Sequence, residues 1–301
     1  MIARDGRLRR VEVLTQREHR SAQWERVVPR VPDELLEAVV FLYPNEEAAK
    51  KGEKAGGTGF FASVRSEVLR RPFIYLVTNL HVASRDLVAR GNTKAGFGLL
   101  RFPKAAWVHH PDGDDVAAAA VDIPDDWQVT ALEWESYGPT PARMKELNVG
   151  IGDETVMVGR FIGHEGQASN QPVARFGNIA LMPGERIIDA RGIRVEAYLI
   201  EMRSLPGFSG SPVFVYIGPA SYRGNKTMMP FYSETIGLVG IDTGHKQESA
   251  SIFDKETGKM IPQPWEVRQN SGVAIVAPYW KIKDVLDEEV FVRQREVVDK
   301  Q

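Results

Sequence analysis

The chain has 301 residues, of which 43% are hydrophobic, so it is long enough to bury a substantial core in one large domain or two small ones. Its 38 basic and 40 acidic side chains nearly balance, which argues against the concentrated basic surface of a protein that binds nucleic acid or an anionic membrane. With no cysteine, no apolar export signal near its start and no run of 18 apolar residues, the chain is expected to be cytoplasmic and to lack a membrane span.

Residues 1–34 are predicted to form an N-terminal extension. They are polar, and Pro29 and Pro32 stand too close together for a helix or a central strand. From residue 35 onward, short β-branched and aromatic runs alternate with glycine, proline, asparagine and aspartate, which indicates many short strands. The first series of predicted strands covers residues 36–43, 58–64, 73–82, 96–102, 106–110 and 116–123.

A second series of predicted strands follows the proline-rich segment at residues 139–141. It covers residues 155–162, 173–181, 195–202, 211–217, 235–241 and 273–277. Helices are predicted at residues 46–54, 141–147 and, most clearly, 279–290, where apolar residues recur at helical spacing. Residues 216–234 and 243–272 are predicted to be long loops that select the substrate.

Three short segments carry candidate catalytic residues. His81 closes an apolar run, Asp115 immediately precedes a small-residue apolar run, and Ser209 lies in the sequence Gly-Phe-Ser-Gly-Ser-Pro at 207–212. A serine nucleophile needs a base that takes its proton, and histidine titrates near the pH at which this is useful. The histidine in turn needs an acceptor for its other ring nitrogen, which a buried aspartate supplies.

The glycine two positions before Ser209 has a separate role. It allows a sharp turn in which the backbone N–H groups of Gly207 and Ser209 point to one spot. A carbonyl oxygen that becomes negatively charged would be stabilised there. We therefore expect these two residues to form an oxyanion hole.

Neighbouring residues compete for two of these roles. Asp115 is favoured over Asp114 because it abuts the apolar run, whereas Asp114 would close the preceding turn. Ser209 is favoured over Ser204 and Ser211 because it alone has a glycine two positions before it and Gly-x-Pro after it.

The remaining histidines invite a metal-site hypothesis that the spacing does not favour. His109 and His110 are adjacent, and adjacent residues on a strand point to opposite faces, so the pair cannot easily bind one ion. His164 and His245 lie in Gly-rich surroundings and are expected to be exposed loop residues. We expect neither a metal nor a cofactor.

In type and order, the three segments resemble the trypsin-like serine peptidases. Residues 78–82, Thr-Asn-Leu-His-Val, look like the Thr-Asn-x-His-Val form of bacterial HtrA/Deg-type members, and residues 115–117 and 207–212 look like the family's acid and nucleophile blocks. The resemblance covers about residues 35–290. It implies an all-β, chymotrypsin-like fold of two six-stranded antiparallel barrels, at 35–148 and 149–277, followed by a C-terminal helix and tail at 278–301.

The resemblance also implies a function. His81 and Asp115 would come from the first barrel and Ser209 from the second, and together they would form the triad of a serine endopeptidase. Its partner would be a protein or peptide substrate, with no nucleic acid and no membrane. The missing signal and cysteines suit a bacterial cytoplasmic member that acts with an activating protein partner.

Four further residues are candidates for substrate binding by the same resemblance. Gly240, Ile241 and Asp242 belong to the segment that looks like the strand that pairs with the substrate backbone. The base of the primary specificity pocket would lie near Arg203. Its guanidinium would favour an acidic side chain or point outward, and both readings stay open.

The chain also departs from the family pattern. Phe208 stands where many members have Asn or Asp, so activation by a newly cut N-terminus is not expected. No PDZ-like domain is expected after the C-terminal helix. A peptidase-fold binding protein that is catalytically silent or needs a partner remains the alternative. An α/β-type esterase is disfavoured because His81 and Asp115 precede the serine.

Overall fold

The computed structural model describes residues 31–66, 68, 72–138, 140–161, 163, 165–189, 191–217, 236–261 and 267–300. Residues 31–301 form one compact unit. Most of the predicted N-terminal extension, His164 and most of the predicted loop at 216–234 lie outside the described residues.

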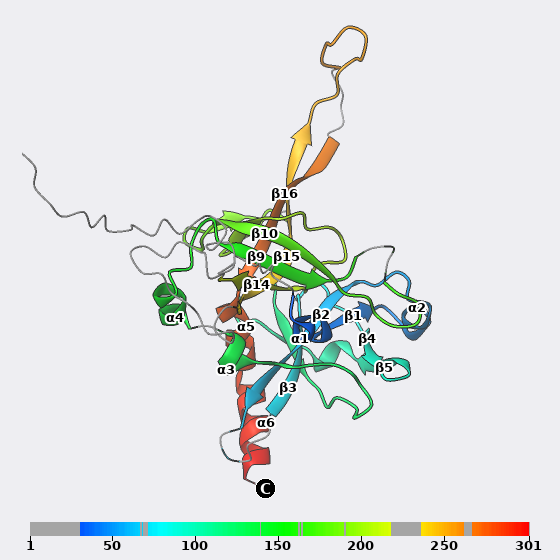
Figure 1. Cartoon of the computed structure of the whole chain (residues 1–301), viewed down its shortest axis with the longest axis vertical. Coiled ribbons are helices and arrows are strands. Elements are labelled where there is room, and N and C mark those ends of the chain that lie inside the picture. Colours follow the sequence, from blue (N-terminus) through cyan, green and yellow to red (C-terminus); the bar gives the residue numbers. More distant parts are fainter. Residues whose placement is uncertain are drawn as a thin grey trace, which may run out of the picture. The chain divides into compact units, whose positions relative to one another are not determined.

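The first half of this unit is an eight-stranded sheet. Seven strands follow the order β5-β4-β1-β2-β3-β7-β6, and β8 pairs with β2 in parallel (Figure 1). Its strands are β1 (Val39–Tyr43), β2 (Gly57–Arg65), β3 (Pro72–Thr78), β4 (Leu87–Thr93), β5 (Gly96–Phe102), β6 (Val108–His109), β7 (Ala117–Ala120) and β8 (Leu132–Glu133). The pairing leaves β5 and β6 as the two ends, so closure of this half into the first predicted barrel is not confirmed.

The second half is a closed six-stranded antiparallel barrel, as predicted. Its strands follow the order β10-β13-β16-β15-β14-β9. They are β9 (Glu154–Gly159), β10 (Val173–Leu181), β13 (Tyr198–Glu201), β14 (Pro212–Tyr216), β15 (Ile236–Ala250) and β16 (Val267–Pro278). Between β10 and β13, the short strands β11 (Ile187–Ile188) and β12 (Arg194–Val195) pair as a small hairpin.

The two ends of the predicted loop at 243–272, residues 243–250 and 267–272, form a β-ribbon. β15 and β16 remain paired from the barrel as far as Ala250 and Val267, and Figure 1 shows them running on beyond the barrel as an arm. The prediction of a loop was wrong here because the arm is polar and exposed, and therefore carries none of the apolar alternation by which strands are recognised. Strand pairing along the ribbon decides its structure instead.

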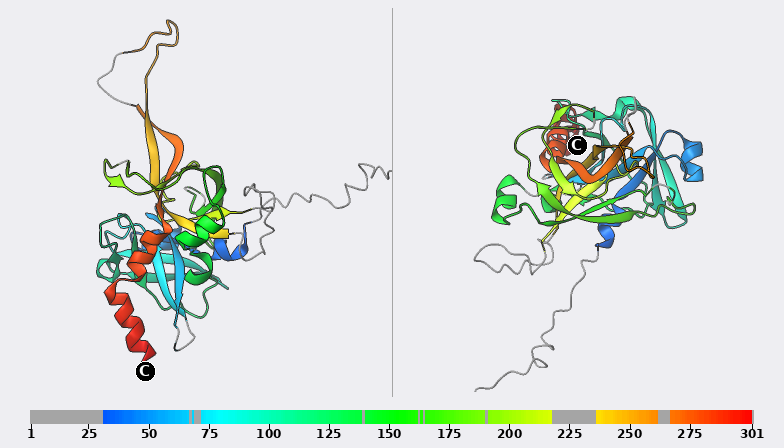
Figure 2. Two further views of the ribbon diagram at one scale, coloured as in Figure 1. Left: turned by 90° about the vertical axis from the view of Figure 1, so that its left-hand side faces the viewer. Right: turned by 90° about the horizontal axis from the view of Figure 1, so that it is seen from above.

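The described helices are short. They are α1 (Asp33–Glu37), α2 (Glu46–Lys51), α3 (Trp134–Tyr137), α4 (Pro141–Glu146), α5 (Tyr279–Leu286) and α6 (Glu289–Asp299), with a 3-10 turn at Lys104–Ala106. The helix predicted at 279–290 ends earlier, and α6 follows it. In α6, Phe291 packs on Tyr75 of β3, which places α6 beside the first sheet (Figure 2). None of the described helices has both the length and the apolar character that a membrane crossing requires.

A loop of the second half is fixed to the first half by buried arginines. Arg90 of β4 is fully buried, and its guanidinium donates to the carbonyls of Gly166 and Gln167. Arg160, which follows β9, donates to the carbonyl of Ala55 and forms an ion pair with Glu165. Buried guanidinium groups require such partners, and these contacts join the two halves next to the start of β2.

Candidate active site

His81 lies just beyond the end of β3. Asn79, which is fully buried, donates from its side-chain Nδ2 to the backbone carbonyl of Asp115 over 2.9 Å. This bond ties the turn after β3 to the segment before β7, the strand that pairs with β3. The His81 side chain itself is 41% exposed, so its ring is open to solvent on one side.

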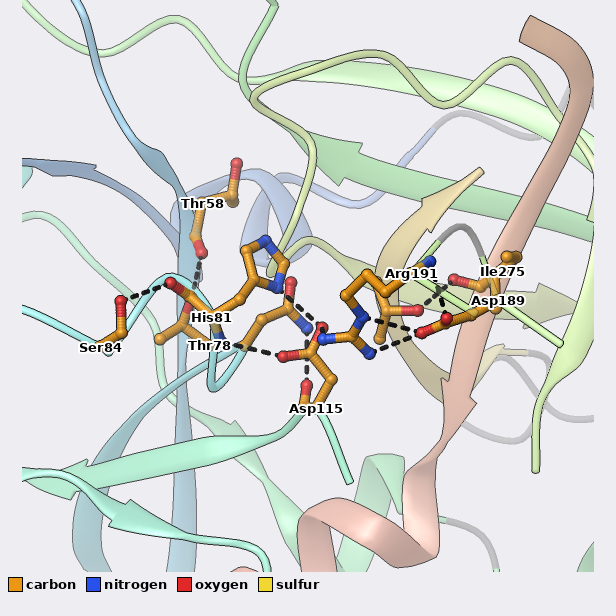
Figure 3. Close-up of polar contacts among 10 residues, drawn as sticks. Thr58, Thr78, His81, Ser84, Asp115, Asp189, Arg191 and Ile275 are labelled. Atoms are coloured by element: carbon orange, nitrogen blue, oxygen red, sulfur yellow. Dashed lines mark hydrogen bonds and ion pairs between the residues drawn. The ribbon is translucent and has the colours of Figure 1, made fainter. Parts of the chain in front are cut away.

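Asp115 is the residue that pairs with His81. Its Oδ2 lies 2.7 Å from His81 Nδ1, and its Oδ1 accepts the backbone N–H of His81 over 2.9 Å (Figure 3). The Asp115 side chain is only 3% exposed. Asp114, its rival in the sequence, instead pairs with Lys281 of α5 at 2.7 Å. The geometry therefore fixes the imidazole with Nδ1 toward the carboxylate and leaves Nε2 free to act as a base.

Ser209 is the second residue of the second of two successive glycine-containing turns, 205–208 and 208–211. The Phe208 N–H donates to the carbonyl of Leu205 over 3.1 Å, and the Ser211 N–H donates to that of Phe208 over 2.8 Å. Each turn has glycine at its third position with a positive φ, 96° at Gly207 and 89° at Gly210. This is the type II pattern, which requires glycine at that position.

Phe208 anchors this loop in the core. Its side chain is fully buried, and the guanidinium of Arg175 lies 4.9 Å from its ring centroid. The residue that departs from the family pattern therefore has a packing role in this chain. Its buried ring holds the backbone on the N-terminal side of Ser209 in place.

The loop that carries Ser209 is docked on Thr58 of β2. The Thr58 backbone N–H donates to the carbonyl of Ser209 over 2.8 Å, and its hydroxyl donates to the carbonyl of Gly207 over 2.9 Å. Thr78, at the end of β3, donates in turn to the Thr58 carbonyl over 2.7 Å. Thr78 lies three residues before His81, so the same patch of the first half holds both His81 and the loop that carries Ser209.

These contacts leave two backbone donors of the loop unused. The Phe208 N–H is bonded to Leu205, and the Gly210 N–H donates to the carbonyl of Asp242 over 2.9 Å. Within the described part of the chain, the N–H groups of Gly207 and Ser209 have no acceptor, and the Ser209 hydroxyl makes no hydrogen bond. Two free N–H groups beside a serine are what an oxyanion hole requires.

The other two serines of this region are enclosed. Ser204 is 1% exposed, and its hydroxyl donates to Asp242 Oδ2 over 2.9 Å. Ser211 is fully buried, with its hydroxyl against the backbone of Gly159, where a side chain would collide with it. Only Ser209 is half-buried, which makes it the one of the three that a substrate can reach.

The structure places the four predicted substrate-binding residues in different surroundings. Gly240 and Ile241 are paired with β14 on one side and β16 on the other, so neither offers a free backbone edge to a peptide. Asp242 is fully buried. Arg203 is exposed, and its charge adds to the desolvation that lowers the pKa of Arg175.

A free edge begins immediately after Asp242. The Asp242 N–H donates to the carbonyl of Ser211, and the Asp242 carbonyl accepts the N–H of Gly210; among the described residues, no bond beyond Asp242 joins β15 to the segment that leads into β14. From Thr243 to His245, β16 is the only described strand that pairs with β15. The sequence predicted that this edge begins at Gly240, three residues earlier in the chain. The strand register, which no sequence motif reveals, places its start at Thr243.

Asp242 is a buried carboxyl beside the site. Burial raises its pKa to about 7, the charge of Asp115 adds to this, and hydrogen bonds from Ser204 and from the backbone of Gly244 oppose it. Folding thus stabilises the protonated form relative to the unfolded chain, in which the pKa is 3.8. The stability that this proton contributes is fully present below about pH 4 and is lost as the pH rises through about 7.

Replacing Asp242 with asparagine should remove this pH dependence. Asparagine keeps an oxygen that accepts from Ser204 but has no charge to bury. Between pH 4 and pH 8 the free energy of unfolding of the wild type should fall relative to that of Asp242→Asn, by up to about 4 kcal/mol for a shift of this size. Denaturant unfolding curves for both proteins across this range measure the difference, and parallel curves would contradict the assignment.

Arg191 is a site residue that the sequence did not indicate. It lies in the β11–β12 hairpin of the second half, and its Nη1 is 3.3 Å from Asp115 Oδ2, the oxygen that also faces His81 (Figure 3). Asp189 of the same hairpin holds the guanidinium from the other side. No motif surrounds Arg191, and only the tertiary structure brings it to the His81–Asp115 pair.

The His109–His110 pair is divided, as strand geometry requires. His109 is exposed, whereas the buried ring of His110 lies 3.2 Å from Asp284 and 3.6 Å from Asp114. Among the residues that the structure describes, no three His, Asp or Glu side chains are grouped to hold a metal ion.

No protein-family model and no curated protein matches this chain. Among solved structures, it is similar to the protease domain of MamO from Magnetospirillum magneticum in its apo form, with a TM-score of 0.48, 16% identity and coverage of 85% of this chain and 98% of the other. It is also similar to Deg5 (0.43, 14%, 70% and 81%) and to the HtrA-type protease AlgW with a decapeptide (0.40, 13%, 82% and 53%).

Proposed function

We propose that this chain is a serine endopeptidase with His81 as base, Asp115 as acid and Ser209 as nucleophile. The observation that carries the proposal is the His81–Asp115 pair, 2.7 Å between Nδ1 and Oδ2, beside a docked serine loop with two free N–H groups. A histidine fixed by an aspartate next to a reachable serine is the arrangement that nucleophilic acyl transfer needs.

The proposed reaction has two halves. Ser209 Oγ bonds to the carbonyl carbon of the peptide while its proton passes to His81 Nε2. The C–N bond then breaks, and the amine leaves with that proton, which leaves an acyl ester on Ser209. Water repeats the sequence, giving its proton to His81 and its oxygen to the carbonyl carbon, and Ser209 regains the proton when the acid product departs.

The two free N–H groups would act on the intermediate of each half-reaction. As the carbonyl oxygen becomes negatively charged, the N–H groups of Gly207 and Ser209 donate to it. Thr58 binds the carbonyls of both residues, which holds the backbone that carries the two donors in place. One such donor is typically worth about 10²–10³ in rate.

For the substrate, we propose an extended peptide. It would pair with the free edge at residues 243–245, which begins beside the serine loop. An unpaired strand edge offers main-chain donors and acceptors that any extended peptide can meet. Arg203, which is exposed, stays a candidate for contact with an acidic side chain.

The sequence expectations on organisation and location are also part of the proposal. The first sheet would take the place of the first barrel, with domain limits at 35–148, 149–277 and 278–301 after an extension at 1–34. We propose a cytoplasmic protein of bacterial origin that acts on proteins or peptides without a metal or cofactor and without nucleic acid or membrane.

One observation also fits a second candidate, a peptidase-fold protein that is silent until a partner binds. Within the described residues, the Ser209 hydroxyl makes no hydrogen bond to His81. Catalytic hydrogen bonds are often long before substrate binds, so this geometry suits both an active resting state and a partner-dependent one. A measurement of the reactivity of Ser209 distinguishes the two candidates.

A fluorophosphonate probe tests the proposal directly, because it reacts with an activated serine. The wild type should be labelled, and peptide mass spectrometry should place the label on Ser209. Ser209→Ala should lose the label, and His81→Gln should be labelled at least about 10²-fold more slowly because the base is missing. Ser211→Ala, which removes the neighbouring buried hydroxyl, is the matched control and should still react. A folded wild type that does not react would favour the silent protein.

A further inference from the structure

The β11–β12 hairpin reaches from the second half of the molecule to the triad acid of the first. Asp189 Oδ1 accepts the backbone N–H groups of Arg191 (2.8 Å) and Ile193 (2.9 Å), which fixes the turn of the hairpin. Its Oδ2 lies 2.8 Å from Arg191 Nε and 2.7 Å from Nη2. The third nitrogen, Nη1, remains to face Asp115 (Figure 3).

Resting on the proposed peptidase function, we infer that Arg191 restrains the triad through its charge, which acts on His81 by way of Asp115. It shares Asp115 Oδ2 with His81 and offsets part of the charge that Asp115 presents to the imidazole. Its contact with Asp115 at 3.3 Å is longer than that of His81 at 2.7 Å, so it weakens the His81–Asp115 pair without replacing it.

Arg191 is not needed to orient the carboxylate. Asp115 already binds the backbone N–H of His81 through Oδ1 and the ring of His81 through Oδ2, and Asn79 holds its backbone carbonyl. These three bonds fix the position of Asp115 from within the first half. What Arg191 adds is therefore a positive charge at the oxygen that must stabilise the imidazolium.

The sign of the effect follows from Coulomb's law. His81 becomes positively charged as it takes the proton of Ser209, and a guanidinium at the shared oxygen opposes that charge. Asp115 is nearly fully buried, which preserves the interaction, whereas the Arg191 side chain is 42% exposed, which screens it. Removal of the Arg191 charge should therefore speed acylation by about threefold to tenfold.

Asp189 moderates this effect. Desolvation alone would raise its pKa, but hydrogen bonds from Ile193 and Arg191 and the charge of Arg191 hold the pKa of Asp189 below its usual value. Asp189 is thus the counter-charge that draws the guanidinium away from Asp115. If Asp189 is neutralised, the guanidinium of Arg191 should interact more strongly with Asp115, and acylation should slow by about threefold to tenfold.

Four single substitutions and one double variant test the inference. Arg191→Gln should raise the rate at which a fluorophosphonate phosphonylates Ser209, and Arg191→Lys, which keeps the charge, should stay near the wild type. Asp189→Asn, which keeps an acceptor for the two backbone N–H groups, should lower the rate, and much less so when combined with Arg191→Gln. Arg194→Gln makes the same charge change on an exposed residue of the same hairpin and should change nothing.

A second readout needs no activity. The Nδ1–H proton between His81 and Asp115 should give a low-field resonance in proton NMR of the resting protein, because the two heavy atoms lie 2.7 Å apart. In Arg191→Gln this resonance should move further downfield because Asp115 Oδ2 then serves His81 alone, and in Arg194→Gln it should not move.

The outcomes separate the two proposals. An unmoved resonance in Arg191→Gln, or an acylation rate that is unchanged or lower, overturns the restraint by Arg191. If no variant reacts with the probe, the peptidase proposal fails, and the resonance alone then decides whether Arg191 weakens the His81–Asp115 bond.

Discussion

Replacing Asp115 with asparagine is expected to lower peptide hydrolysis by about 10⁴-fold without unfolding the protein. The asparagine oxygen can still accept one N–H of His81, so the residue keeps its place. With its oxygen on the backbone N–H of His81, the asparagine turns its NH2 group toward Nδ1 and donates to it, so the ring proton moves to Nε2. The neutral side chain also cannot stabilise a positively charged ring. The imidazole would then present the wrong tautomer to Ser209.

Asp114→Asn is the matched control for this variant. It removes a carboxylate one residue away that binds Lys281 instead of His81. Hydrolysis of a peptide substrate should fall little, while the midpoint of denaturant unfolding drops because Lys281 loses a partner in a nearly buried position. Equal losses of activity in the two variants would remove Asp115 from the triad.

Gly210→Ala is expected to be among the most damaging single substitutions in the chain. A Cβ at this position would lie 1.9 Å from the carbonyl oxygen of Thr58 and 2.5 Å from the hydroxyl of Thr78, and the residue has a φ of 89°. The left-handed backbone alone costs about 1–2 kcal/mol for a residue with a side chain. With the forced backbone shift, the free energy of unfolding should fall by about 3–5 kcal/mol.

Activity should fall even in the fraction of Gly210→Ala that folds, because the shift separates the serine loop from Thr58. Gly113→Ala provides the comparison. Its φ is 77°, but nothing lies within 4 Å of the added Cβ, so it shows the conformational cost alone. Thermal or denaturant unfolding of both variants measures the difference, and equal losses of stability would contradict a close approach at Gly210.

Much of the fold could be predicted because apolar runs and turn residues mark most strands. β4 is the main omission in the first half. Its sequence, Leu-Val-Ala-Arg-Gly-Asn-Thr, places an arginine in the middle, which suggests a loop. Arg90 is nevertheless fully buried, since its guanidinium lies 4.1 Å from the ring centroid of Phe97 and binds two carbonyls of a distant loop. The two carbonyls lie more than seventy residues away in the sequence, so no local pattern indicates that Arg90 is buried.

Some residues of the candidate site could likewise be predicted from local sequence, whereas others are brought there only by contacts between distant segments. The predicted pairing of His81 with an acid, and the choice between Asp114 and Asp115, depend on residues inside recognisable motifs. The free edge after Asp242 depends on a strand register, and the contact of Arg191 depends on how a hairpin reaches another half of the molecule. Neither is a property of a short sequence segment, so neither could be read before the structure.

Thr58 has a consequence for the order in which the molecule matures. It is synthesised almost 150 residues before the serine loop whose carbonyls it receives. A nascent chain therefore contains His81 and Asp115 before Ser209 has been synthesised, and the serine loop gains its final shape only when the barrel of the second half docks on the first sheet. The candidate site is therefore completed late in folding. Its parts come together only where the two halves meet, and neither half contains the whole site.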